Sequence, residues 1–80
     1  MEKLISILEQ CDIANYNGEY TSWFYDEETN QIDFEIVSSG EGFTVKNESF
    51  PLVDNTIELH TTSGETIFLD LYVITKPSFK

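Results

Sequence analysis

The first part of the chain carries apolar side chains at the spacing of a helix. They recur every three or four positions, and polar side chains fill most of the other face; the apolar positions are Leu4, Ile5, Leu8 and Cys11. This pattern predicts one amphipathic helix over about residues 2–14. Asn17 and Gly18 follow it, and both residue types commonly end helices because they tolerate left-handed backbone angles.

After Gly18 the pattern changes to a period of about two, which is typical of strands with one buried face. Segments rich in aromatic and β-branched residues, separated by turn residues, predict five strands at about 20–25, 31–37, 43–46, 56–60 and 66–75. The last of these is nearly continuously apolar, which indicates a central strand or one whose second face is used. Residues 47–55 lack a clean period and contain Pro51, so we interpret them as a longer connection with Phe50 and Leu52 tucked under the fold.

Together these segments predict an α+β fold, in which one N-terminal amphipathic helix packs on an antiparallel sheet of about five strands. A chain of 80 residues has room for one small domain, so residues 1–80 are expected to form a single unit. The hydrophobic fraction of 40% and the aromatic fraction of 14% favour a folded chain over a disordered acidic one.

The charge of the chain is strongly one-sided. Fifteen Asp and Glu stand against four Lys and Arg, and between residues 4 and 75 only Lys46 opposes fourteen carboxylates. Such a surface repels nucleic acid and anionic membranes and speeds encounter with basic proteins. The single cysteine excludes an internal disulfide and no signal or membrane-spanning stretch is visible, so a cytoplasmic location is expected.

The sequence contains no catalytic or cofactor signature, so neither an enzyme nor a bound cofactor is expected. We interpret the single His60 as a partly exposed sheet residue, because a catalytic histidine needs an oriented partner and structural zinc sites usually take four Cys or His ligands. Cys11 falls on the apolar side of the predicted helix, which indicates a small buried side chain rather than a reactive thiolate.

A calcium loop is the metal site that the acidic run most resembles. Asp26, Glu28 and Asn30 fall at the first, third and fifth positions of an EF-hand loop. Gln31 then stands where glycine is required, and Val37 stands where a bidentate Glu is required. The match fails at both diagnostic positions, and no metal ligand is assigned.

Residues 26–35 carry five carboxylates in ten positions and no Lys or Arg. A surface shaped only for solubility would mix both signs, and like charges across strands are destabilising, so a role in binding is predicted. On the predicted topology, four acidic residues share the sheet face away from the helix, with Phe68, Tyr72 and Tyr20 or Trp23 interleaved. The predicted partner-binding residues are Asp26, Glu27, Glu28, Asp33 and Glu35, with Glu58 and Asp70 as second choices; the four on the sheet face are Asp33, Glu35, Glu58 and Asp70.

The leading hypothesis is a non-catalytic protein that inhibits a nucleic-acid-binding protein or nuclease by occupying its basic surface. In size, acidity and lack of catalytic motifs the chain resembles the small acidic inhibitors carried by phages and mobile elements, including anti-CRISPR proteins and other DNA mimics. The resemblance implies no particular functional residue or target.

Two alternatives stay open at this point. One is an immunity protein that neutralises a basic toxin nuclease. The other is a structural or assembly module that forms a homodimer through an edge strand and exposed aromatic residues. Net repulsion favours a monomer over such a dimer.

Overall fold

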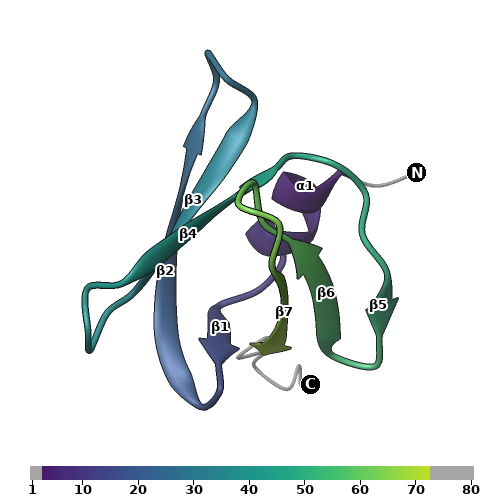
Figure 1. Ribbon diagram of the computed structural model, residues 1–80. Helices are drawn as coiled ribbons and strands as arrows, with labels where there is room; N and C mark the ends of the chain where they lie inside the picture. The colour runs from purple at the N-terminus through teal and green to yellow at the C-terminus, as the bar shows by residue number, and fades with distance from the viewer. Residues whose placement is uncertain (1–2, 73–80) are drawn as a thin grey trace.

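Seven antiparallel strands and one short helix form the part of the chain, residues 3–72, that the computed structural model describes (Figure 1). In chain order the elements are α1 (Leu4–Glu9), β1 (Ile13–Tyr16), β2 (Glu19–Asp26), β3 (Gln31–Ile36), β4 (Gly42–Lys46), β5 (Leu52–Val53), β6 (Thr56–His60) and β7 (Thr66–Tyr72).

The strands form one sheet in the order β4-β3-β2-β1-β7-β6-β5. This sheet curls into a half-barrel, so that the edge strand β4 approaches the far end of β6. A bridge between Val45 and Thr61 joins the two, and the Thr62 N–H donates to the Thr44 carbonyl oxygen at 2.8 Å.

The predicted α+β fold with a five-stranded sheet is wrong, because the described chain is mostly sheet and its helix has six residues. The predicted helix over 2–14 is too long: it ends at Glu9, and Ile13–Tyr16 form β1. Asn17 and Gly18 are a two-residue hairpin turn rather than a helix stop, since their φ angles are 53° and 82° and Tyr16 pairs with Glu19. Asn-Gly favours such a turn because both of its central residues need positive φ.

The segment predicted as a long connection, 47–55, contains β5, which like β1 was not predicted. Val53 in β5 pairs with Thr56 in β6, and Asp54 at the turn between them has a φ of 58°. Phe50 is half-buried against the core, whereas Leu52 is 45% exposed, so only Phe50 is covered as predicted.

Four predicted strands, 20–25, 31–37, 43–46 and 56–60, correspond to β2, β3, β4 and β6. The fifth, 66–75, corresponds to β7 over residues 66–72, and its residues 73–75 lie outside the described part of the chain.

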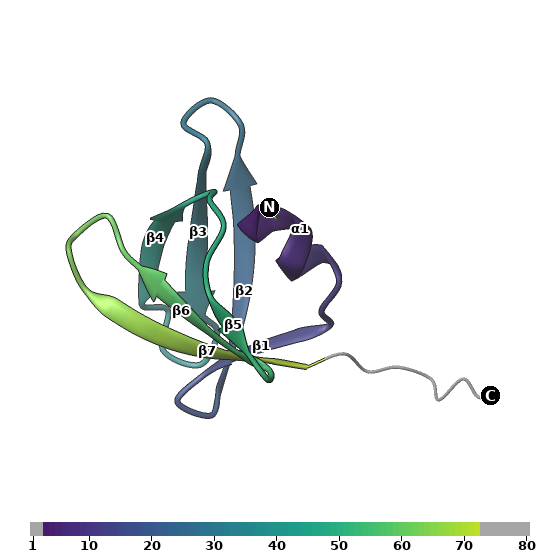
Figure 2. The same ribbon diagram turned by 90° about the vertical axis from the view of Figure 1, so that its right-hand side faces the viewer.

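Strict alternation along the strands fills the core from one face of the sheet. In β3, Ile32, Phe34 and Ile36 are buried, and the residues between them are exposed. The same alternation in β7 buries Ile67, Leu69 and Leu71. α1 covers one open side of the curled sheet (Figure 2), where it contributes Leu4, Ile7 and Leu8 to the core.

Candidate functional site

The outward face of the curled sheet carries four of the predicted carboxylates. Asp33 and Glu35 alternate with the buried residues of β3 and are exposed. Glu58 in β6 and Asp70 in β7 are half-buried, and they also lie between side chains that point into the core. All four therefore face away from the core.

The order of the strands divides the seven predicted residues into two groups. The hairpin group consists of the carboxylates of the β2–β3 hairpin: Asp26, Glu27, Glu28, Asp33 and Glu35. The second group consists of Glu58 on β6 and Asp70 on β7. In the sheet, β2 and β1 lie between β3 and β7, so the second group is at least three strands away from β3. Because the sheet curls, the two groups lie on different parts of its outer surface.

Local hydrogen bonds hold the framework of the hairpin group. The Asp26 carboxylate accepts the backbone N–H of Glu28 at 3.0 Å, which orders the turn, and the Asp33 carboxylate accepts the Thr44 hydroxyl at 2.6 Å. No partner for the side chains of Glu27, Glu28 or Glu35 is found within residues 3–72. Three carboxylates of this group are thus presented to solvent without compensation.

Asn30 and Asn47 tie the tip of this hairpin to the rest of the fold. Asn30 ends the turn with a φ of 59°, and its side-chain oxygen accepts the Tyr25 hydroxyl at 2.8 Å and the Asn47 amide at 3.4 Å. Asn47 is buried, and its own side-chain oxygen accepts the backbone N–H of Ile5, in the first turn of α1, at 3.1 Å. The position of the acidic tip is therefore coupled to the helix.

Exposed aromatic rings lie among the acidic residues. Phe24 is 67% exposed and pairs across the strands with Asp33, and Phe68 is 55% exposed and pairs with Glu58. Tyr20 also faces outward, whereas Trp23 packs against the core. Phe24 was not among the aromatic residues predicted for this face, although the period of two along YTSWFYD places it on the same face as Tyr20.

The second group is tied into its own surroundings. The Asp70 carboxylate accepts the Thr56 hydroxyl at 2.8 Å, and the Glu58 carboxylate lies 3.1 Å from His60 Nε2. His60 is exposed at the end of β6, and its Nδ1 lies 3.3 Å from the Thr66 hydroxyl. Among the seven predicted residues, only Glu58 contacts a basic side chain within the described chain, and this contact is an ion pair only when His60 is protonated.

Cys11 is half-buried beside the core, and its thiol donates to the Ile7 carbonyl oxygen at 3.3 Å. Burial, and then the charge of Asp12, raise the pKa of the Cys11 thiol, so it stays protonated at neutral pH. Within residues 3–72 no group of three His, Cys, Asp or Glu is placed to hold a metal ion.

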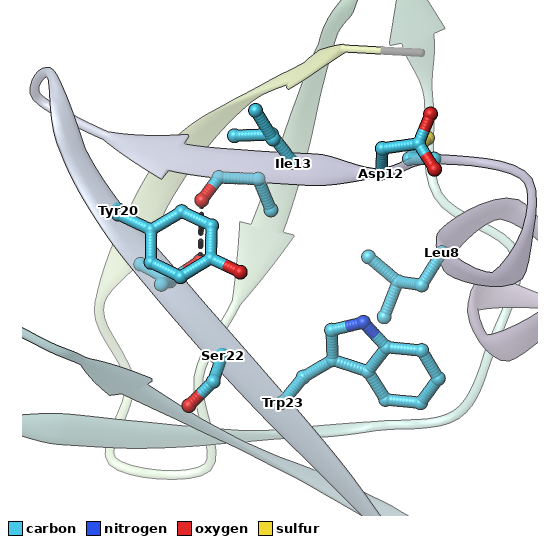
Figure 3. Close-up of a pocket in the computed structure, with 9 residues that line it drawn as sticks. Leu8, Asp12, Ile13, Tyr20, Ser22 and Trp23 are labelled. Carbon is cyan, nitrogen blue, oxygen red and sulfur yellow. Dashed lines mark hydrogen bonds between the residues drawn. The ribbon is translucent and has the colours of Figure 1, made fainter. Parts of the chain in front are cut away.

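Two hollows lie on either side of this cysteine. One, of about 230 Å³, lies between α1 and the β1–β2 hairpin and is lined by Leu8, Asp12 and Trp23 among others (Figure 3). The other, of about 400 Å³, lies between α1 and the β5–β6 turn.

Comparison with known proteins finds no matching family model, no similar curated protein and no similar solved structure. In the part of the chain that the structure describes, no helix is long and apolar enough to span a membrane.

Proposed function

We propose that this chain is a non-catalytic cytoplasmic protein that binds the basic surface of a nucleic-acid-binding protein or nuclease and thereby inhibits it. One observation carries the proposal: the β2–β3 hairpin presents three exposed carboxylates that have no partner in the described chain, together with an exposed phenylalanine paired with Asp33. This combination suits an interface, because aromatic anchors and desolvated Arg–carboxylate pairs supply much of the energy of protein–protein binding.

The geometry of β3 supports this reading. Asp33 and Glu35 lie two positions apart on one strand, so their Cα atoms are roughly 7 Å apart. Each carboxylate can then pair with a separate Arg or Lys, while Phe24 packs beside them. The net charge of −11 adds long-range attraction, which speeds association with a basic protein at low salt.

Charge reversal on the hairpin tests the proposal. The triple variant Glu27→Lys, Glu28→Lys and Glu35→Lys removes only carboxylates that lack side-chain partners within the described chain, and it leaves the Asp26 turn intact. A control variant, Glu9→Lys, Glu48→Lys and Glu65→Lys, changes the net charge equally at exposed positions on other loops and at the end of α1. Circular dichroism checks that both variants stay folded.

The readout is inhibition of purified basic nucleases and DNA-binding proteins from the native host, at stoichiometric excess and low salt. We expect the wild-type protein to inhibit at least one of them, the hairpin variant to lose at least tenfold in potency, and the control variant to lose far less. Equal loss in both variants would show that only net charge matters. Absence of inhibition by the wild-type protein would refute the proposed function.

The homodimer alternative has one structural observation in its favour. The outer edge of β5 is free within the described chain, and Val53 is 69% exposed beside Leu52. Mass in solution at two salt concentrations separates the readings, because a hydrophobic dimer persists or tightens as salt rises, whereas acid–base association with a partner weakens.

A further inference from the structure

Strand β2 is longer than the strand that covers one of its edges. It pairs with β3 from Thr21 to Asp26, but β1 covers only Glu19–Thr21. At Ile13 the chain of β1 leads back toward α1, so the remainder of this edge of β2 has no strand beside it within residues 3–72.

The backbone groups of Trp23 and Tyr25 point out of this uncovered edge. In an antiparallel sheet, successive residues of a strand bond to opposite neighbours. The Tyr20 and Asp26 carbonyl oxygens accept N–H groups from Val37 and Asn30, so the even-numbered residues of β2 bond toward β3. The odd-numbered residues face the other way, and no hydrogen bond to the backbone of Trp23 or Tyr25 on that side is found in the described chain.

The 230 Å³ hollow lies next to this edge. Part of its wall is apolar, since the side chains of Leu8 on α1 and Trp23 on β2 point toward one another, and polar side chains, Asp12 among them, line the rest (Figure 3). The edge therefore combines backbone groups that have no strand partner in the described chain, the apolar side chains of Leu8 and Trp23, and the outward carboxylates of β3 on the far side of β2, and such elements suit an extended peptide bound as an added strand.

We propose that the β2 edge at residues 23–25 accepts an extended segment of a basic partner protein, with alternating basic and apolar residues, as an additional strand. Residues opposite Trp23 and Tyr25 would have inward side chains, and the apolar side chains of Leu8 and Trp23 suit aliphatic groups there. The neighbouring residues would point outward, on the face that carries Asp33 and Glu35 on β3, which lies on the far side of β2. A second copy of this chain is a poor occupant, because its own segments repeat the same negative charge.

This inference rests on the proposed function for the charge of the peptide, but its test is independent. The probe is an end-blocked peptide of about seven residues in which Arg and Val alternate. In an added strand the Val residues lie opposite Trp23 and Tyr25, so their N–H groups bond to β2, whereas the Arg N–H groups point away. N-methylation of the Val nitrogens therefore blocks the pairing, and N-methylation of the Arg nitrogens leaves it intact at identical charge.

Binding is followed at low salt by the fluorescence of Trp23, the single tryptophan, and by amide hydrogen exchange. We expect the unmodified and Arg-methylated peptides to bind within about threefold of each other, and the Val-methylated peptide to bind at least tenfold more weakly. The Trp23 and Tyr25 amides should become protected only with the first two.

Equal binding of the two methylated peptides, or no protection of these amides, would refute the proposal of an added strand. Charge attraction alone would then account for the binding. That result would not contradict the proposed function, because inhibition of basic proteins by the hairpin group is measured separately. Failure of all three peptides to bind would also overturn the inference.

Discussion

Replacement of Asn47 by alanine should destabilise the whole fold, although Asn47 lies outside every regular element. α1 has six residues, and so short a helix does not persist without support from the rest of the protein. Its N-cap residue, Lys3, makes no side-chain cap hydrogen bond, so the Ile5 N–H is satisfied instead by Asn47 at 3.1 Å. Asn47→Ala removes this acceptor and also the 3.4 Å contact with Asn30.

The magnitude follows from these two losses. Removal of a helix cap costs about 0.5–2 kcal/mol, and leaving a buried donor without a partner costs about 1–3 kcal/mol. The contact with Asn30 is long and adds little. We therefore expect the free energy of unfolding to fall by about 1.5 kcal/mol, which corresponds to a decrease in Tm of roughly 6–12 °C for a domain of this size.

Urea unfolding followed by the fluorescence of Trp23 measures this change, because Trp23 packs against the core beside Leu8 of α1. Asn47→Asp keeps an oxygen that can accept the Ile5 N–H, and it should recover part of the loss. Asn55→Ala is the matched control: Asn55 is exposed, and only its carbonyl oxygen has a partner in the described chain, so stability should change by less than about 0.5 kcal/mol. The reasoning is refuted if Asn47→Ala unfolds with the midpoint of the wild-type protein, or if Asn47→Asp is as damaging as alanine.

Three further predictions concern single positions. Thr21→Val should lower the free energy of unfolding by about 1 kcal/mol, because the buried hydroxyl donates to the Ala14 carbonyl oxygen at 2.7 Å where β1 leaves β2; an unchanged thermal midpoint would contradict this. Gly42→Ala should cost about 1–3 kcal/mol in urea unfolding, since a Cβ at this position would lie 2.6 Å from the Phe34 carbonyl oxygen, and wild-type stability would show that the strands part easily. Cys11 should react with iodoacetamide at pH 8 more slowly than a free small thiol, because its raised pKa leaves less thiolate at that pH; an equal or faster rate would argue against a half-buried, protonated thiol.

Sequence periodicity was reliable where strands alternate strictly. Ile32, Phe34 and Ile36 in β3 lie in the core, as their spacing indicates, and the carboxylates between them face outward. The helix was overextended because Asn17–Gly18 suits both a helix stop and a hairpin turn. Local pattern cannot choose between them; β1 is a strand because it pairs on both sides, with β2 and with β7, which lies more than fifty residues away in the chain.

Only part of the candidate site could be predicted from the sequence, again because long-range pairing decides the rest. The outward direction of Asp33, Glu35, Glu58 and Asp70 follows from alternation within each strand. Their separation into two groups depends on the strand order and on the curl of the sheet, which are set by long-range pairing. The uncovered edge of β2 arises from the mismatch between a strand of eight residues and a neighbour of four, and no local signal reports it.

The central claim is that the hairpin group docks on a basic protein surface. Its most direct test is to map amide chemical-shift changes on the ¹⁵N-labelled protein as it binds a basic nuclease or DNA-binding protein that it inhibits. We predict that the largest changes lie at Phe24, across residues 26–28, and at Asp33 and Glu35. Changes confined to the hollow between α1 and the β5–β6 turn, around Gln10 and Asn55, would contradict the claim.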